Sequence, residues 1–300
     1  MVDMSCQNSL AFQMQEVGPR DGFQIIDEFI PTSIKLETID RMVKAGLTKI
    51  QVTSFVNPKA VPQMRDAAEV AATCVEKYPD TQIFALVPNL RGAQNAADTG
   101  LREIAVVLSL SESHNKANVG KSVAESIEET KRIRDAFPEM KIVQDISTVF
   151  GCPFEGKLEL QNLIELISEL NDIGICEFTL CDTIGTAHPA QVKKVFETVS
   201  ATFPDKIFNV HIHDTRNMGM LNTYIAIQCG ARGVQSSLGG LGGCPFAPGA
   251  SGNTATEDLV YMLHAEGFET GVDFNRLLEA ARYLKGLVKG NYSGHLAMIG

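Results

Sequence analysis

Two histidines separated by one residue are the strongest candidates for chemistry in the sequence. His211 and His213 lie in the apolar run IFNVHIHD (207–214), which has the composition of a β-strand. Because alternate residues of a strand point to the same face, the two imidazoles would project side by side. With a carboxylate from another strand they would form a site with open positions for a divalent metal. We expect Mg²⁺ or Mn²⁺, with Zn²⁺ or Co²⁺ as the alternatives.

Asp21 follows the first apolar run, FQMQEVG (12–18), and could supply that carboxylate. Without it, one histidine of such a pair is more often a packed core residue and the other part of a loop. The neighbouring Arg20 could pair with Asp21 to stabilise a turn, or it could hold a carboxylate or a developing enolate oxygen with two hydrogen bonds. The glycines and the proline around this dipeptide predict a sharp bend instead of a plain strand-to-helix turn.

A third candidate lies in the glycine-rich segment GGLGGCPFAPGASGN (239–253), which contains Cys244. Glycines allow hinge motion, so one interpretation is a lid whose cysteine acts as an acid or a base. The alternative is a wide turn that contains an inert thiol. Spacing alone leaves both open.

The rest of the chain predicts a scaffold that would bring these residues together. Short apolar runs alternate with segments of helical periodicity, which is typical of parallel βαβ units. The eight runs cover residues 12–18, 49–55, 82–88, 103–110, 141–148, 175–182, 207–214 and 233–239. A doubly wound sheet would show a GxGxxG turn after the first strand, where this chain has GPRDG. We therefore expect an α/β fold, a (β/α)8 TIM barrel, as one catalytic domain over 1–300 with its core at about 12–290.

The ends of the expected elements refine this prediction. Helical segments at 33–46, 160–174 and 220–230 are among those that end in a glycine placed like a helix C-cap; these glycines are Gly46, Gly100, Gly174 and Gly230. The tail after residue 255 is expected to form helices that pack on the barrel. Because barrel chemistry gathers at the carboxyl ends of the strands, polar residues there should converge on one mouth.

Composition excludes several classes of function. The net charge is −10 and no basic stripe is present, so nucleic acid is not an expected partner. No apolar run approaches the roughly 20 residues that span a bilayer, so no membrane partner is expected. Seven cysteines, an odd number without a CxxC pair, indicate reduced thiols. Together with the lack of a secretory signal, this predicts a cytoplasmic protein.

Several longer motifs resemble the 3-hydroxy-3-methylglutaryl-CoA lyase family. They are EVGPRDGFQ (16–24), TSFVNPKAVPQM (53–64), GCPFEGK (151–157), DTIG (182–185), HIHDT (211–215) and GGLGGCPFAPGASGNTATEDLVYML (239–263). The resemblance covers roughly residues 12–290. The last motif is specific to the lyases and is far less like the isopropylmalate or homocitrate synthases, which share the barrel and the metal.

The resemblance implies a divalent-metal-dependent carbon–carbon lyase that cleaves 3-hydroxy-3-methylglutaryl-CoA (HMG-CoA) to acetyl-CoA and acetoacetate. It implies an acyl-CoA substrate and a homodimer or larger homo-oligomer. The implied metal ligands are Asp21, His211, His213 and Asn253. The implied catalytic residues are Arg20, Cys244, Asp182 and Glu257, and the substrate contacts are Arg20, Gln24, Gln51 and His114.

Two positions depart from the family pattern and keep alternatives open. Gln51 stands where the lyases carry a catalytic glutamate, and glutamine can neither take a proton nor hold a charge. His114 stands where an aromatic residue is frequent, and it could carry protons, contact a different substrate, or be a solvated loop residue. The alternatives are a lyase for citramalyl-CoA or another 3-hydroxyacyl-CoA, a Claisen-type synthase or pyruvate aldolase, and a non-catalytic binding homologue.

Overall fold

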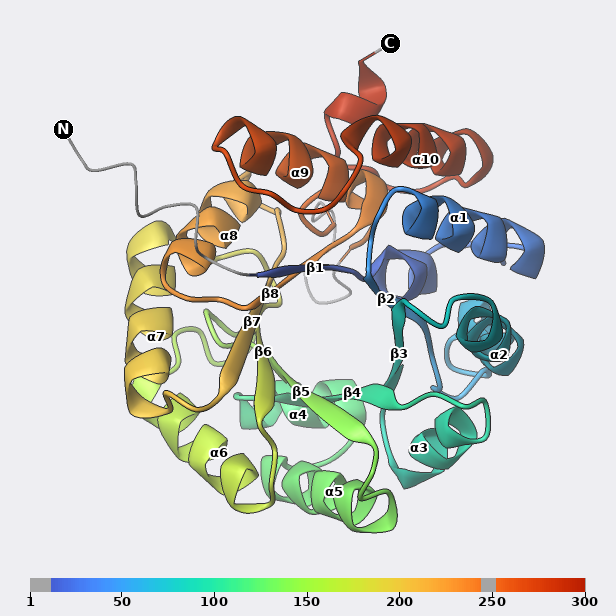
Figure 1. Ribbon diagram of the computed structural model, residues 1–300. Coiled ribbons are helices and arrows are strands. Elements are labelled where there is room, and N and C mark those ends of the chain that lie inside the picture. Colours follow the sequence, from blue (N-terminus) through green and yellow to red (C-terminus); the bar gives the residue numbers. More distant parts are fainter. Residues whose placement is uncertain (1–11, 244–251, 300) are drawn as a thin grey trace, which may run out of the picture.

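The computed structural model describes residues 12–243 and 252–299, which form a closed barrel of eight parallel strands (Figure 1). The strands are β1 (Gln13–Glu16), β2 (Lys49–Ser54), β3 (Gln82–Val87), β4 (Glu103–Ser109), β5 (Lys141–Ser147), β6 (Glu177–Asp182), β7 (Ile207–Ile212) and β8 (Gly233–Ser236). They follow one another in chain order, and β1 closes the barrel on β8. The predicted TIM barrel is confirmed, and each predicted apolar run contains one strand.

Helices form the outer ring of the barrel (Figure 1). They are α1 (Thr32–Lys44), α2 (Ala67–Lys77), α3 (Leu90–Ala97), α4 (Glu112–Val119), α5 (Val123–Ala136), α6 (Leu160–Asp172), α7 (Pro189–Thr202), α8 (Gly219–Gln228), α9 (Thr256–Ala265) and α10 (Phe274–Leu287). The last helix, α10, packs against α1 and α9, which confirms the prediction for the tail. None of the helices in the described part of the chain is both long and apolar enough to cross a membrane.

The predicted helix ends are also confirmed. Gly46, Gly100, Gly174 and Gly230 have φ angles of 95°, 86°, 86° and 97°. This left-handed region favours glycine, because a Cβ atom would be strained there. At the other end of a helix, Ser122 begins α5 with a capping box, in which its hydroxyl and the Glu125 carboxylate each accept a backbone N–H of the other residue.

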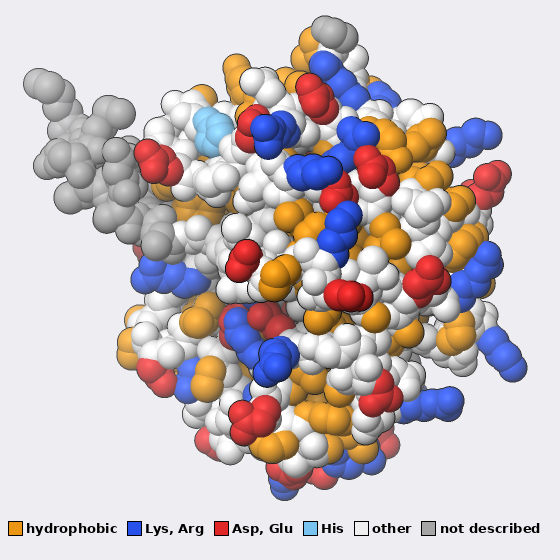
Figure 2. Space-filling model, turned by 45° about the vertical axis from the view of Figure 1, so that its right-hand side comes forward, with side chains coloured by type: hydrophobic (Ala, Val, Ile, Leu, Met, Phe, Trp, Pro, Cys, Tyr) orange, Lys and Arg blue, Asp and Glu red, His pale blue; other side chains and the backbone are white. Residues whose placement is uncertain are grey.

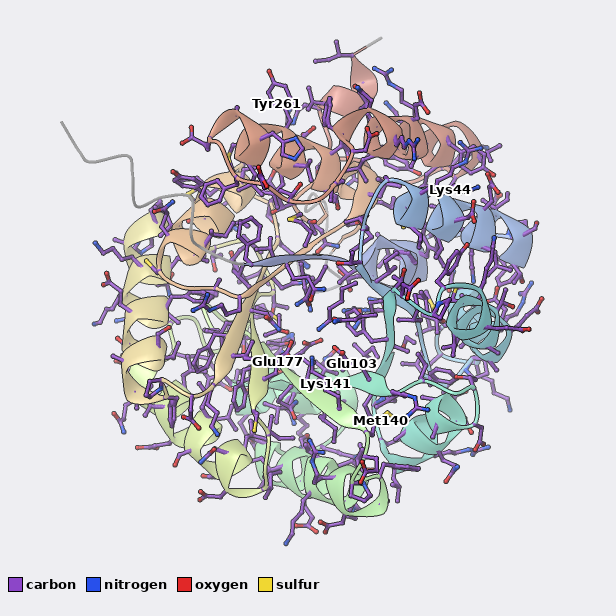
Figure 3. The ribbon with its side chains drawn as sticks, in the orientation of Figure 1. Lys44, Glu103, Met140, Lys141, Glu177 and Tyr261 are labelled. Atoms are coloured by element: carbon purple, nitrogen blue, oxygen red, sulfur yellow. The ribbon has the colours of Figure 1, made fainter. Side chains whose placement is uncertain are left out.

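The N-terminal end of the barrel holds four charged side chains, one from the first residue of each of β2, β4, β5 and β6. Figure 3 labels three of them, Glu103, Lys141 and Glu177. Lys49 Nζ lies 2.6 Å from Glu103 Oε1, and Lys141 Nζ lies 2.7 Å from Glu177 Oε2. The two crossed distances, from Lys49 Nζ to Glu177 Oε1 and from Lys141 Nζ to Glu103 Oε2, are both 3.3 Å. Burial by itself raises the pKa of Glu177, but Lys49 and Lys141 outweigh it and hold that pKa below its usual value. We call these four residues the basal cluster.

The outer surface has a mixed character on the face that is turned forward in Figure 2. Acidic and basic side chains are interspersed there, and neither sign forms a continuous patch. Buried charge lies at both ends of the barrel strands, in the basal cluster at one end and at Arg20 and Asp21 at the other.

Candidate active site

Arg20 and Asp21 lie on a π-helical turn, Gly18–Gly22, that directly follows β1. Neighbouring side chains on a helical turn diverge less than they do on a strand, and here both are buried beside one cavity. A Cβ atom on Gly22 would lie 2.9 Å from the carbonyl oxygen of Leu241, so this position requires glycine. The sharp bend predicted from the sequence is confirmed, and it delivers a cation and an anion to the same place.

The structure brings Asp21 together with both histidines at the carboxyl end of β7. Their nearest ligand atoms all lie within 4.8 Å of one another. The Nε2 atoms of His211 and His213 lie 4.0 and 3.9 Å from Asp21 Oδ2, and the two rings are 5.2 Å apart between centroids. One carboxylate from the turn after β1 and two imidazoles from the end of β7 form a donor set for a divalent metal.

The protonation states of these groups fit a metal. Burial alone would raise the pKa of Asp21, but Arg20, His211 and His213 outweigh it and lower that pKa to about 2. Burial lowers the pKa of His213 to about 4. At neutral pH the site therefore offers an ionised carboxylate and a neutral imidazole, which are the forms that bind metals.

A second contact fixes the orientation of His211. Its Nδ1 atom lies 2.9 Å from Oε1 of Gln235, an amide oxygen that can only accept a hydrogen bond. Nδ1 of His211 therefore donates this hydrogen bond, and Nε2 lies on the side of the ring that faces Asp21, 4.0 Å from Oδ2. Partners of this kind hold metal-binding histidines in place.

Asn253 adds an oxygen donor to the set. Its Nδ2 donates to Asp21 Oδ2 at 2.8 Å, and its buried Oδ1 has no hydrogen-bond partner among residues 12–243 and 252–299. On the chain just before it, a Cβ atom on Gly252 would lie 2.5 Å from the backbone of Gly242, so these two glycines are in contact. The predicted catalytic Cys244 belongs to segment 244–251, which lies outside the described residues.

A cavity of about 530 Å³ opens beside this donor set. Six predicted residues line it: Arg20, Asp21, Gln24, His114, His211 and His213. Gln24 Nε2 donates to Asp21 Oδ1 at 3.1 Å and so braces the carboxylate. His114 is buried, its Nδ1 atom lies 2.6 Å from Ser109 Oγ, and burial lowers its pKa to about 4. The volume suits a small organic ligand.

Gln51 reaches this site through Arg20 and does not line the cavity itself. It is fully buried on β2, and its Oε1 accepts a hydrogen bond from Arg20 Nε, while Arg20 Nη1 pairs with Asp21. The pairing of β2 with β3 shifts register between Gln51 and Thr53, an irregularity that often accompanies functional sites. Gln51 and Asp21 therefore hold the guanidinium from two sides.

The structure places Asp182 and Glu257 behind the cavity, not in its lining. The two carboxyl oxygens of Asp182 accept the backbone N–H groups of Thr186 and Ala187 at 3.0 and 2.9 Å, which holds the loop after β6. Glu257 Oε2 accepts the N–H of Gly239 at 2.9 Å, and burial raises the pKa of Glu257 to about 8. Both residues support loops that border the site.

One carboxylate in the cavity was not selected from the sequence. Asp145 on β5 is 3% exposed and lines the cavity beside Arg20 and Asp21. Burial raises its pKa, although Arg20 and a hydrogen bond from Thr179 partly oppose that effect. The available signal was its position in the run KIVQDIST, where strand alternation puts Asp145 on the same face as Val143 and Ser147.

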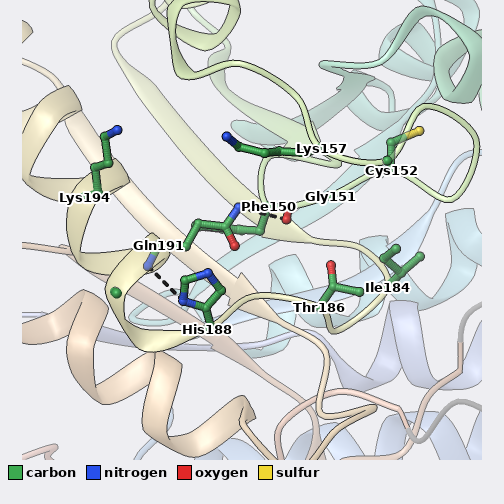
Figure 4. A pocket seen from close by; sticks show the side chains of 11 residues that line it. Phe150, Gly151, Cys152, Lys157, Ile184, Thr186, His188, Gln191 and Lys194 are labelled. Carbon is green, nitrogen blue, oxygen red and sulfur yellow. Dashed lines mark hydrogen bonds between the residues drawn. The ribbon is translucent and has the colours of Figure 1, made fainter.

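A second pocket, of about 580 Å³, lies among the loops after β5 and β6 and the start of α7 (Figure 4). Lys157, His188 and Lys194 are among its lining residues, and Gln191 Nε2 donates to the carbonyl oxygen of Phe150 at 2.9 Å. None of the predicted site residues lines it. The cavity beside Asp21 is therefore the candidate active site.

Fold and donor set together define a (β/α)8-barrel protein with a candidate divalent-metal centre at the carboxyl ends of its strands. Residues 11–284 match the family described as HMGL-like, and the chain belongs to that family. The resemblance seen in the motifs is thereby confirmed.

Individual relatives match over most of their length. The chain is 42% identical over 274 residues to a hydroxymethylglutaryl-CoA lyase of Bacillus subtilis, covering 91% of each. It is 42% identical over 271 residues to the cytoplasmic 3-hydroxy-3-methylglutaryl-CoA lyase of Rattus norvegicus, covering 90% of this chain and 79% of that one. A solved HMG-CoA lyase from Acinetobacter baumannii, in complex with coenzyme A and 3-methylmalate, matches with a TM-score of 0.92 and 38% identity over 97% of this chain and 95% of that one.

Proposed function

We propose that this protein is a divalent-metal-dependent carbon–carbon lyase that cleaves HMG-CoA to acetyl-CoA and acetoacetate. The observation that carries the proposal is the convergence of Asp21, His211 and His213 beside Arg20 in one cavity, in a chain of the HMGL-like family. Relatives at 42% identity are named HMG-CoA lyases, and the related A. baumannii lyase was solved with coenzyme A, which supports an acyl-CoA substrate.

The donor set assigns roles to the residues that would hold the metal. Asp21, His211, His213 and the free amide oxygen of Asn253 would bind Mg²⁺ or Mn²⁺, with Zn²⁺ or Co²⁺ as alternatives. A divalent ion in that place polarises the oxygens of a bound 3-hydroxyacyl group. Gln24 and Gln235 orient Asp21 and His211 through the contacts described above.

Arg20 is the group that stabilises developing charge. Cleavage turns the hydroxyl carbon into a ketone and leaves the bonding electrons on the thioester fragment as an enolate. The Arg20 guanidinium, held between Asp21 and Gln51, is preorganised to donate hydrogen bonds to the enolate oxygen. Cys244 as the residue that returns a proton to the enolate stays a prediction from the resemblance. Asp182 and Glu257 act as positioning residues for the neighbouring loops.

A specific observation favours a second candidate, a lyase for citramalyl-CoA or another 3-hydroxyacyl-CoA. The amide of Gln51 in place of a carboxylate changes the charge behind Arg20, and the neutral, buried His114 gives the cavity wall a different hydrogen-bonding character. Gln51 acts on the cavity through Arg20, and His114 lines it directly.

The test is a comparison of thioesters with metal-stripped and reloaded protein. We expect acetyl-CoA release from HMG-CoA only after Mg²⁺ or Mn²⁺ is restored. The variant His213→Ala should abolish it, whereas His264→Ala, an exposed histidine on α9, should leave it unchanged. Full activity in the stripped protein would contradict the proposal. Faster turnover of citramalyl-CoA, with pyruvate as the second product, would select the second candidate.

The extent of the catalytic unit is part of the same proposal. Site residues come from the turn after β1, from the end of β7 and from the segment after β8, so the first and the last strands of the barrel both border the site. We therefore propose one catalytic domain over residues 1–300. A homodimer or larger homo-oligomer and a cytoplasmic location stay predictions, which sedimentation of the purified protein and cell fractionation would test.

A further inference from the structure

Asp145 carries a carboxyl oxygen that is buried and unused. The side chain lines the cavity with Arg20 and Asp21 and is 3% exposed. Its Oδ1 atom has no hydrogen-bond partner in the part of the chain that the structure describes. A buried oxygen left in this state costs about 1–3 kcal/mol, so such an atom calls for a ligand.

The Asp145 carboxyl group stands at the end of a series of hydrogen bonds that crosses the barrel. Thr179 is the register partner of Asp145 on β6, and its side chain bonds the carboxylate. Gln235 Nε2 donates to Thr179 Oγ1 at 3.4 Å, and Gln235 Oε1 accepts from His211. Because the Thr179 hydroxyl already accepts from Gln235, its own hydrogen goes to Asp145.

In this series of hydrogen bonds every donor points the same way, from His211 through Gln235 and Thr179 toward Asp145. A chain of this polarity ends on an acceptor, so it favours the ionised carboxylate and holds it in one orientation. It links Asp145 to the candidate metal ligand His211 through Gln235 and Thr179. Asp145 is therefore oriented by the same network that orients the donor set.

Other carboxylates are not available to a substrate in this cavity. Among the described residues only Asp21 and Asp145 line it with a carboxylate. Both oxygens of Asp21 are engaged, Oδ1 by Arg20 and Gln24 and Oδ2 by Asn253. Gln51 cannot take a proton. Asp145 is the carboxylate that remains.

We propose that Asp145 is a catalytic residue, the base that accepts the proton of the substrate's 3-hydroxyl group. This role rests on the proposed function. As the O–H bond breaks, the proton goes to Oδ1 of Asp145 and the electron pair forms the new C=O bond. The C2–C3 bond breaks, and its electrons become the thioester enolate beside Arg20. One proton added at C2 gives the acetyl thioester and balances the proton taken from the hydroxyl group.

The test is the isosteric variant Asp145→Asn, with Asp172→Asn at the exposed end of α6 as its control. We expect kcat of Asp145→Asn to fall by about 10²–10⁴-fold, the usual contribution of a general base, with KM changed little. Titration of the metal-free protein with Mn²⁺ should give the same affinity for both variants and the wild type. Thermal unfolding should show that both variants fold.

A second variant, Thr179→Val, keeps the carboxylate and removes its tether, and we expect a smaller fall in kcat at unchanged Mn²⁺ affinity. Asp145→Asn with a normal kcat, or with a raised KM alone, would overturn the role. So would loss of Mn²⁺ binding in step with activity, since that result would make Asp145 part of the metal site. These results leave the proposed function intact, whereas a wild-type protein inactive on every thioester overturns both.

Discussion

At the N-terminal end of the barrel, Lys49 and Lys141 face Glu103 and Glu177, and every carboxylate lies within 3.3 Å of a lysine. At the C-terminal end, charge is also buried but is only partly paired. Arg20 pairs with Asp21, while single oxygen atoms of Asp145 and Asn253 have no hydrogen-bond partner among the described residues. Every buried carboxylate of the basal cluster is paired with a lysine, whereas Asp145, beside the cavity at the opposite end, has no ion pair among the described residues.

This difference shows how function can be located from electrostatics alone. A buried ion pair that is complete gives no reason to expect a ligand, and its loss shows as lost stability. A buried polar atom without a partner costs free energy in the empty protein, and that cost is recovered only when a ligand binds. The two ends should therefore respond differently to mutation. Substitutions in the basal cluster should lower stability, and substitutions beside the cavity should lower activity.

The largest effect is expected from breaking the basal cluster. Lys49→Met leaves the half-exposed Lys141 as the remaining cation beside Glu103 and Glu177, and removal of one partner from a buried pair costs about 3–5 kcal/mol. We expect the free energy of unfolding in urea to fall by that amount while kcat of the folded enzyme stays the same. Lys44→Met, at a lysine whose side chain is 70% exposed, should cost no more than about 1 kcal/mol. A loss of kcat in Lys49→Met would erase the distinction between the two ends.

The second effect concerns the cation at the mouth. Arg20→Gln removes the guanidinium that faces the cavity, and loss of one such preorganised donor lowers kcat by about 10²–10³-fold. Steady-state kinetics on the best thioester would measure it, with the exposed Arg276→Gln as the control. If kcat were unchanged, Arg20 would be a turn stabiliser only.

A smaller effect is expected one contact further from the chemistry. Gln235→Leu removes the acceptor of His211 Nδ1 and should weaken metal binding by about 10–100-fold, as loss of such partners commonly does. Calorimetric titration of metal-free protein would measure the affinity. Gln191→Leu, which loses a bond to Phe150 in the other pocket, is the matched control. Equal affinity in the two variants would show that the His211 contact is dispensable.

The smallest effect separates the two lysines of the basal cluster. The side chain of Lys141 is 47% exposed, so solvent screens its pairs and Lys141→Met should cost about 1 kcal/mol or less at pH 7. Burial lowers the pKa of Lys141, but Glu103 and Glu177 outweigh it and raise that pKa above 10.5. A raised lysine pKa adds stability below 10.5 that is lost as the pH rises through the folded value. The free energies of unfolding of the wild type and Lys141→Met, measured in urea, should therefore converge above pH 10.5. A difference between them that widens there would contradict this account.

Much of the fold could be predicted because it depends on local patterns. Each apolar run contains a strand, the four cap glycines have positive φ angles, and the bend at GPRDG is present as a π-helical turn. The basal cluster was not predicted. Its four residues lie at the starts of strands that are far apart in sequence, and only the register of the closed barrel brings them together.

The site was predictable where spacing defines direction. His211 and His213 share a face because of their spacing, and the structure brings them to Asp21 as expected. The direction in which a side chain points was harder to predict for single polar residues near strand ends. Asp182 accepts backbone N–H groups of the following loop, while its neighbour Cys181 lines the cavity. Asp145, one of the polar residues of the predicted strand ends, was not chosen as a site residue, because its unpartnered oxygen is a property of the assembled barrel.

The contact between Gly242 and Gly252 has a consequence for how such a protein can diverge. The described residues on either side of segment 244–251 therefore meet at one point, beside Asn253. Lengthening a segment between fixed ends costs only about 0.6 kcal/mol for each doubling. A change of length between these two glycines would therefore leave the barrel, the turn after β1 and the two histidines in place.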